Sequence, residues 1–170
     1  MNIKKFVFLA FFSFVIGSSC AFTEEITGFW KSINEKSHQP ESVVAIYEYK
    51  GLYYGRIVAT YDKQGKITET LKDPKERAPG VIGNPYYCGL DFIWRLAKKN
   101  DRYQGKIMDP EKGKIYRAAL WVQNGNLIVR GELFIFGRNQ TWLPFKDSEF
   151  SSGFNKPDVA KFVPVIPKVK

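Results

Sequence analysis

Strand-like runs alternate with two strong turn signals between Tyr103 and Trp142, and this tract constrains the fold more than any other part of the chain. The segment Asp109-Pro110-Glu111-Lys112-Gly113 has Pro where a turn presets φ and Gly where the turn accepts a positive φ. Asn124-Gly125, set between two apolar runs, is the strongest short hairpin signal in the sequence. The tract therefore predicts an antiparallel meander, in which each strand pairs with the next along the chain.

Runs rich in β-branched and aromatic residues continue toward the amino end, and no convincing amphipathic helix accompanies them. The expected strands are Gly28–Ile33, Val43–Tyr49, Leu52–Tyr61, Asp91–Ala97, Tyr103–Met108, Lys114–Val122, Asn126–Phe134 and Asn139–Pro144. About eight antiparallel strands in one all-β domain favour a closed barrel, because closure removes exposed sheet edges. A β-sandwich is the alternative. A barrel of this size has an interior that holds packed side chains or one small ligand.

Two segments depart from the strand pattern. Residues 62–89 form a long excursion rich in Gly, Pro and charge. Loops of this length are usually functional or disordered, so a lid over the barrel mouth is one interpretation, and an ordered but inert wrap is the favoured one. Residues 146–170 are polar, then Pro-rich and basic, and we expect an extended or mobile tail after a barrel domain at 22–145.

The first 21 residues have the three-part pattern of a secretory signal peptide. Lys4 and Lys5 precede an apolar run, Phe6–Ile16, which is too short to span a bilayer comfortably. Small residues follow, and cleavage after Ala21 is the favoured site. The alternative is lipidation at Cys20, for which the preceding residues are a poor signal. We therefore expect an exported protein, periplasmic or secreted.

Composition excludes several kinds of site. Cys88 would be alone after cleavage, so no internal disulfide can form, and a buried small hydrophobe is favoured over a reactive thiol. With a single His in the chain, His38, the usual zinc ligands are lacking. Removal of Lys4 and Lys5 with the signal leaves 24 basic and 17 acidic residues, a net charge of +7. These charges are scattered, which argues against nucleic acid and leaves weak attraction to anionic envelope surfaces.

Several motifs resemble an exported bacterial family, the domain of unknown function 2147. They are Gly28-Phe29-Trp30, the stretch 103–116, Val129-Arg130-Gly131 and the stretch 137–142. The resemblance covers roughly residues 26–144 and implies a lipocalin-like, calycin-type barrel with no established reaction. It also implies that the Trp of the first motif lies at the closed end, with an Arg of a late strand across its indole. Trp30 with Arg138 is the expected pair, and Arg130 is the alternative.

The functional prediction is a non-catalytic, exported protein that binds a small apolar or amphipathic molecule inside the barrel. Aromatic residues on the expected strands are the candidate lining: Tyr47, Tyr54, Phe92, Trp94, Tyr116 and Trp142. The same rings would otherwise simply fill the barrel. A packed interaction module that contacts another envelope protein or the membrane surface is the alternative function, and an enzyme using the barrel mouth is a weaker one. Asp109 is explained by its turn, no cofactor is expected, and the ligand and oligomeric state are left open.

Overall fold

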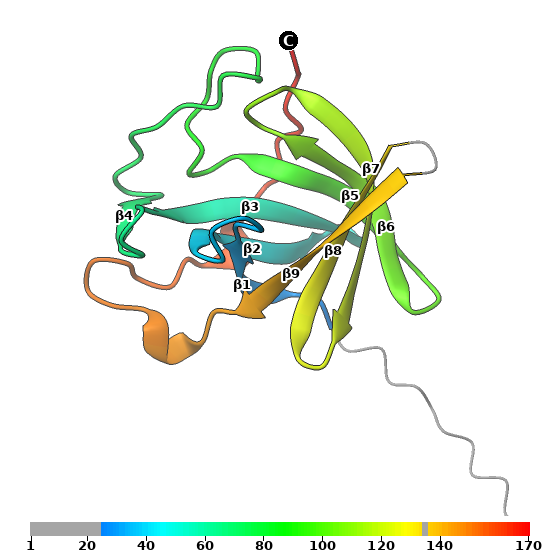
Figure 1. The fold of residues 1–170 in the computed structure, drawn as a ribbon, viewed down its shortest axis with the longest axis horizontal. Coiled ribbons are helices and arrows are strands. Elements are labelled where there is room, and N and C mark those ends of the chain that lie inside the picture. Colours follow the sequence, from blue (N-terminus) through cyan, green and yellow to red (C-terminus); the bar gives the residue numbers. More distant parts are fainter. Residues whose placement is uncertain (1–24, 134–135) are drawn as a thin grey trace, which may run out of the picture.

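The computed structural model describes residues 25–133 and 136–170, and within them nine antiparallel strands form one sheet that closes into a barrel (Figure 1). The strands are β1 (Gly28–Ile33), β2 (Pro40–Tyr49), β3 (Leu52–Tyr61), β4 (Ile67–Thr70), β5 (Asp91–Lys99), β6 (Arg102–Asp109), β7 (Lys114–Gln123), β8 (Asn126–Leu133) and β9 (Phe136–Pro144). The predicted closed antiparallel barrel is confirmed.

Eight of the nine strands make the barrel, in the order β2-β1-β9-β8-β7-β6-β5-β3, and β2 pairs with β3 to complete the ring. The junction between β1 and β9 is short, with Trp30 opposite Pro144 and Lys31 opposite Leu143. The additional strand, β4, pairs only with the end of β3 and lies inside the excursion at 62–89, where no strand was expected.

The tight turns follow the sequence signals. Asn124 and Gly125 both have positive φ, 53° and 74°, as a two-residue hairpin turn of type I′ requires. In the β6–β7 turn, Oδ1 of Asp109 accepts hydrogen bonds from the backbone N–H groups of Glu111 and Lys112, at 3.0 and 3.1 Å. The carboxylate of Asp109 therefore has the turn-forming role that the sequence indicated.

A β-bulge in β5 changes which side chains enter the barrel. Arg56 lies opposite Asp91 and Gly55 opposite Ile93, so Phe92 is an extra residue on the β5 side. Gly55 is needed at this point, because a Cβ there would lie 3.0 Å from side-chain atoms of both Ile46 and Ile93. No residue pattern within β5 itself indicates the bulge.

The end of the barrel that holds the β7–β8 turn, here called the lower part, is solidly packed. Eight of its inward side chains are at most 2% exposed: Ile46, Ile93, Leu96, Tyr103, Leu120, Leu127, Val129 and Trp142. Side chains that line a water-sized void keep some exposed area, so these values leave no such void beside them. Tyr53 and Tyr103 meet edge to face, with 4.8 Å between ring centroids.

Residues 145–170, here called the strap, run along the outside of the barrel as an extended segment with two short 3-10 turns, η1 (Asp147–Glu149) and η2 (Val159–Lys161). Phe145 and Phe154 are 6% and 4% exposed. They pack on the outer face of β1–β3, against Phe29, Val43, Ala45, Val58 and Ala59. This tail was expected to be extended or mobile, and it is an extended layer that buries apolar surface.

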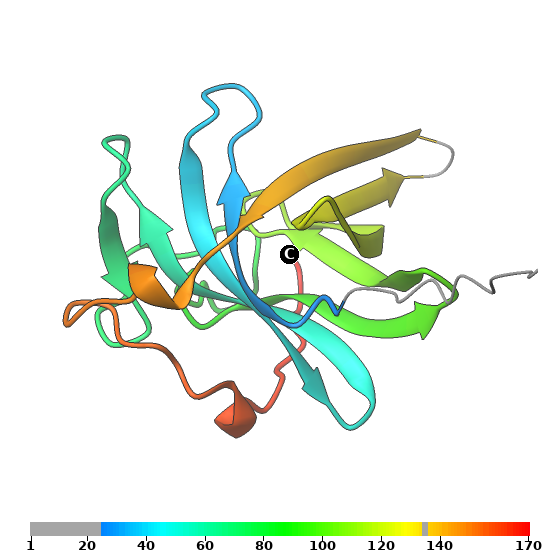
Figure 2. The same cartoon turned by 90° about the horizontal axis from the view of Figure 1, so that it is seen from below.

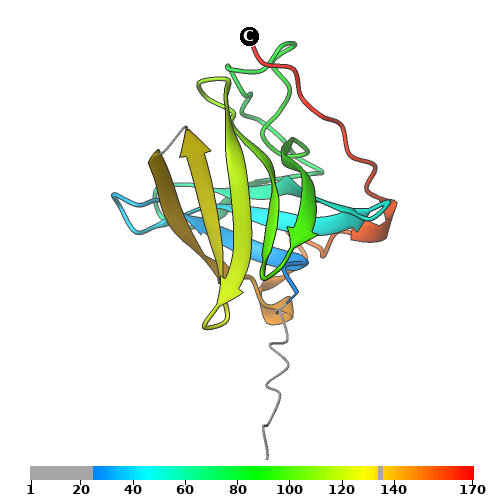
Figure 3. The ribbon, with the colours of Figure 1, turned by 90° about the vertical axis from the view of Figure 1, so that its right-hand side faces the viewer.

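The last residues of the strap return to the excursion. The N–H of Ile82 donates to the carbonyl of Lys168 at 2.8 Å, and the N–H of Lys170 donates to the carbonyl of Gly80 at 3.1 Å. Figure 3 shows this red segment climbing beside the green loops, and Figure 2 shows the orange part of the strap beneath the strands.

The expected signal peptide at 1–21, with Cys20, lies outside the described residues. Within the described part of the chain, no helix is long and apolar enough to cross a membrane.

Candidate functional site

The register of the sheet sorts the six predicted lining residues into two groups. Gly55, Ile93 and Ile107 share the inner face, because Gly55 pairs with Ile93 and Ile93 with Ile107. Tyr116 lies opposite Ile107, so its ring belongs to the same inner face. Phe92 enters the interior through the bulge and stacks on Trp142, with 6.2 Å between ring centroids. The barrel therefore brings together Phe92, Tyr116 and Trp142 of the predicted lining.

The other three predicted lining residues are on the outer face, which corrects the sequence interpretation. Tyr47 and Tyr54 lie opposite each other and stack at 5.8 Å. They alternate with the inward Ile46 and Gly55, so they must point outward. Trp94 follows the inward Ile93 and lies opposite the exposed Lys106.

These outward rings are buried because other segments cover them. Phe162 of the strap meets Tyr47 edge to face at 5.2 Å. An aromatic residue on a strand is therefore not enough to predict an interior position, because this sheet has a second buried face outside the barrel.

One end of the barrel is less tightly packed than the other. Ile107, Tyr116, Gly131 and Gln140 face inward there and are only partly buried. A Cβ placed on Gly131 would have a single neighbouring atom within 4 Å, Cγ2 of Ile107 at 3.9 Å. This end, here called the open end, therefore has room for additional atoms at Gly131.

The open end combines an apolar floor with polar walls. The stacked rings of Phe92 and Trp142 form part of the floor. The indole N–H of Trp142 donates to Oε1 of Gln140 at 3.2 Å, and Gln140 lies two residues nearer the rim on β9. On the neighbouring strands, the hydroxyls of Ser32 and Ser42 are 2.7 Å apart. An apolar base with a few convergent polar groups is typical of small-molecule sites.

The expected contact between Trp30 and Arg138 is not formed. Trp30 is buried, and its indole N–H donates to the carbonyl of Ile26 at 2.9 Å. The side chain of Arg138 is 78% exposed and its Nε pairs with Glu35 at 2.7 Å. The alternative, Arg130, pairs with Glu132 at 2.6 Å. Burial and a backbone hydrogen bond therefore hold Trp30, with neither arginine across it.

A buried carboxylate organises the outer face beneath the strap. Asp91 is 1% exposed, and Oδ1 accepts from the hydroxyl of Tyr47 at 2.8 Å and from Nε of Arg56 at 2.9 Å. Its Oδ2 accepts from Nη2 of Arg56 at 2.7 Å and from the backbone N–H of Val165 at 2.8 Å. Arg56 also donates to the carbonyl of Val163 at 2.9 Å.

This group, Tyr47, Arg56 and Asp91, is here called the clamp, because it joins β2, β3 and β5 to the strap. Desolvation, followed by the charge of Asp91, raises the pKa of Tyr47. Tyr47 therefore stays protonated and acts as a donor. Arg56 is a charged residue within an otherwise apolar part of β3, and its outward partner Asp91 explains its place there.

The described part of the chain contains one free cysteine. Cys88 is buried, and burial, followed by the charge of Glu69, raises the pKa of its thiol to about 12. A thiol with so high a pKa is a poor nucleophile at neutral pH. No group of three His, Cys, Asp or Glu side chains in the described part of the chain is placed to hold a metal ion.

Comparison with known proteins supports both the family resemblance and the fold. Residues 28–143 match the model of a family described as an uncharacterized protein conserved in bacteria, the domain of unknown function 2147. A solved structure of a protein from the human pathogen Helicobacter pylori, described as belonging to the lipocalin family, is similar to this one with a TM-score of 0.57. The two are 22% identical, and the match covers 75% of this chain and 87% of that chain. No curated protein matches the chain.

Proposed function

We propose that this chain, which belongs to the domain of unknown function 2147 family, is a non-catalytic protein that binds one small apolar or amphipathic molecule at the open end of its lipocalin-like barrel. The observation that carries the proposal is the contrast within the barrel. In the lower part of the barrel, eight inward side chains are at most 2% exposed, whereas Ile107, Tyr116 and Gly131 at the open end are only partly buried.

The packed lower barrel sets the size of the ligand. A long acyl chain would need a deep cavity, but Leu120 and Leu127 are both completely buried. The ligand is therefore a small molecule that sits near the rim, with an apolar part against Ile107 and Tyr116 and a polar part toward Gln140.

The proposal includes export to the cell envelope. It is supported by the basic, apolar and small-residue pattern of residues 1–21.

The test uses a substitution that fills the open end. Gly131→Phe places a ring where a Cβ would have one neighbour within 4 Å, whereas Ile128→Phe adds a ring to the outward face of the same strand. Binding of the neutral probe N-phenyl-1-naphthylamine is followed by its fluorescence in titrations of the full chain. We expect the Gly131 variant to bind at least about tenfold more weakly, which is about 1.4 kcal/mol, and the Ile128 variant to bind like the unsubstituted protein.

Equal binding by the two variants would refute the open end as the site. Native mass spectrometry of protein purified from its own host is a second test, for which a retained small molecule is the expected result. Consistently empty protein would favour the second candidate, a packed interaction module, which the fully buried lower barrel supports.

A further inference from the structure

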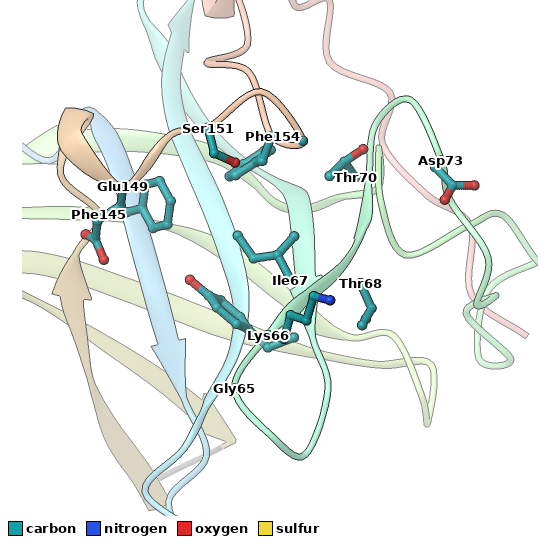
Figure 4. Close-up of a pocket in the computed structure, with 12 residues that line it drawn as sticks. Gly65, Lys66, Ile67, Thr68, Thr70, Asp73, Phe145, Glu149, Ser151 and Phe154 are labelled. Carbon is teal, nitrogen blue, oxygen red and sulfur yellow. The ribbon is translucent and has the colours of Figure 1, made fainter.

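A hollow of about 490 Å³ lies outside the barrel, between the β3–β4 hairpin and the strap (Figure 4). Its lining comes from three places in the chain: Tyr61 at the end of β3; Lys66, Ile67 and Asp73 in and around β4; and Phe145, Glu149 and Phe154 in the strap. This hollow is here called the outer groove. Its volume is within the range of small-molecule sites, about 300–1,000 Å³.

The outer groove has a rigid apolar side. Phe145 and Phe154 are almost fully buried and lie 5.7 Å apart, and both contact the ring of Phe150. Ile67 projects between this aromatic group and the rest of β4 (Figure 4). An aromatic cluster that is already packed loses little side-chain entropy when a ligand binds, so it suits a flat apolar group.

The charges around the outer groove are unequally compensated. Glu149 pairs with Lys31 at 2.7 Å and accepts from the backbone N–H of Lys146, also at 2.7 Å. Asp73 pairs with Lys75 at 3.3 Å. Both acids on the rim are therefore already neutralised by protein cations.

Lys66 is different. Its backbone N–H donates to Asp62, but among the described residues its ammonium group has no ion pair or hydrogen bond. Tyr61 adds a neutral hydroxyl, because burial, followed by the charge of Glu149, raises its pKa to about 12. Among the described side chains that line the outer groove, the charge without a protein partner is thus the positive charge of Lys66, and the same lining includes the hydroxyl of Tyr61.

We infer that the outer groove is a second binding site, specific for a small amphipathic anion whose apolar, ring-bearing body packs on Ile67, Phe145 and Phe154 and whose carboxylate or phosphate meets Lys66. A plain inorganic anion would leave the apolar side unused. A cation would face an unpaired ammonium group and two acids that already have partners. The site is separate from the open end of the barrel, because its lining consists of outer-face and strap residues.

The experiment compares two probes of similar shape and opposite charge, 1-naphthoate and 1-naphthylmethylammonium, each titrated into the ¹⁵N-labelled full chain. Amide shifts are expected at residues 65–70 and 149–154 with naphthoate. Lys66→Gln should weaken naphthoate binding about fivefold, as expected for one exposed ion pair. Lys63→Gln is the matched control, because Lys63 is an exposed lysine of the same turn that does not line the groove; its affinity should not change.

Three outcomes would overturn the inference: equal affinity of the two probes, no effect of Lys66→Gln, or shifts centred on Ile107, Tyr116 and Gly131. The last would place naphthoate at the open end. Gly131→Phe separates the two sites further, since it should weaken binding of N-phenyl-1-naphthylamine in the barrel and leave naphthoate binding in the outer groove intact. Failure of one proposal is therefore distinguishable from failure of the other.

Discussion

Replacement of Asp91 by Leu should destabilise the protein strongly, because it leaves the guanidinium of Arg56 with no anionic partner in a largely buried position. The side chains of Arg56 and Asp91 are 14% and 1% exposed. Removal of one member of a buried ion pair costs about 3–5 kcal/mol. The hydroxyl of Tyr47 and the N–H of Val165 lose their acceptor in the same step, which places the expected loss toward the upper part of that range.

Thermal and urea unfolding measure this loss. For a chain of this size, 1 kcal/mol corresponds to about 2–4 °C, so we expect the melting temperature to fall by about 10 °C or more. The strap should also loosen selectively, because two of its backbone contacts to the barrel are made by the clamp. Limited trypsin digestion should therefore cleave the variant at Lys161 and Lys168 at temperatures where the unsubstituted protein is resistant.

The double variant with Arg56→Met and Asp91→Leu is the critical control. It removes both buried charges, and apolar replacement of a whole buried pair is often neutral or stabilising, so most of the lost stability should return. A single variant that loses less than about 1 kcal/mol would contradict the reasoning. So would a double variant whose loss equals the sum of the two single losses, since that result would mean that Arg56 and Asp91 do not interact.

Two predictions concern protonation. Burial, followed by the charge of Glu25, raises the pKa of Tyr103 to about 12 from an ordinary 10.0, so the native state keeps a proton that the unfolded state loses. Its contribution to stability is complete below pH 10 and is lost as the pH rises toward 12. Urea titrations across this window should show a fall of the unfolding free energy that Tyr103→Phe reduces by about 1.4 kcal/mol per pH unit, and an unchanged slope would refute the assignment. Because the pKa of Cys88 is raised to about 12, iodoacetamide at pH 8 should modify Cys88 only as urea unfolds the chain; rapid modification of the native protein, seen by peptide mass spectrometry, would contradict its burial.

The architecture was predictable because its strongest signals are local. Asn124-Gly125 and the Asp109 turn each fix a hairpin through backbone conformations that few other residues adopt, and hairpins in series give a meander. The directions of the side chains were less predictable. The bulge at Phe92 shifts the alternation of β5 by one residue, and it arises from the pairing with Gly55, which no pattern within β5 reveals.

Unbroken apolar runs in β2 and β3 are a sequence signal for the covered outer face. Residues 43–47 are all apolar or aromatic and all buried, although a strand with one solvated face alternates. Residues 57–59 show the same unbroken burial. Such runs indicate burial on both faces, and the phenylalanines at 145, 150, 154 and 162 are the material that covers the second face. The basic, Pro-rich composition of the strap concealed this role, and with it the outer groove.

The strap also determines the order in which the molecule can be completed. It follows the barrel in the chain, so ribosomes make every strand before the segment that covers β1–β3 exists. Until the strap is made, Phe29, Val43 and Ala45 are exposed to water as a contiguous apolar surface. Apolar surfaces of this kind bind chaperones during synthesis or transport. The family match ends at residue 143, two residues before Phe145. A fragment of residues 28–143 would retain a closed barrel but lack the strap residues that pack on this apolar surface. We therefore expect the fragment to aggregate under conditions in which the longer chain stays dispersed.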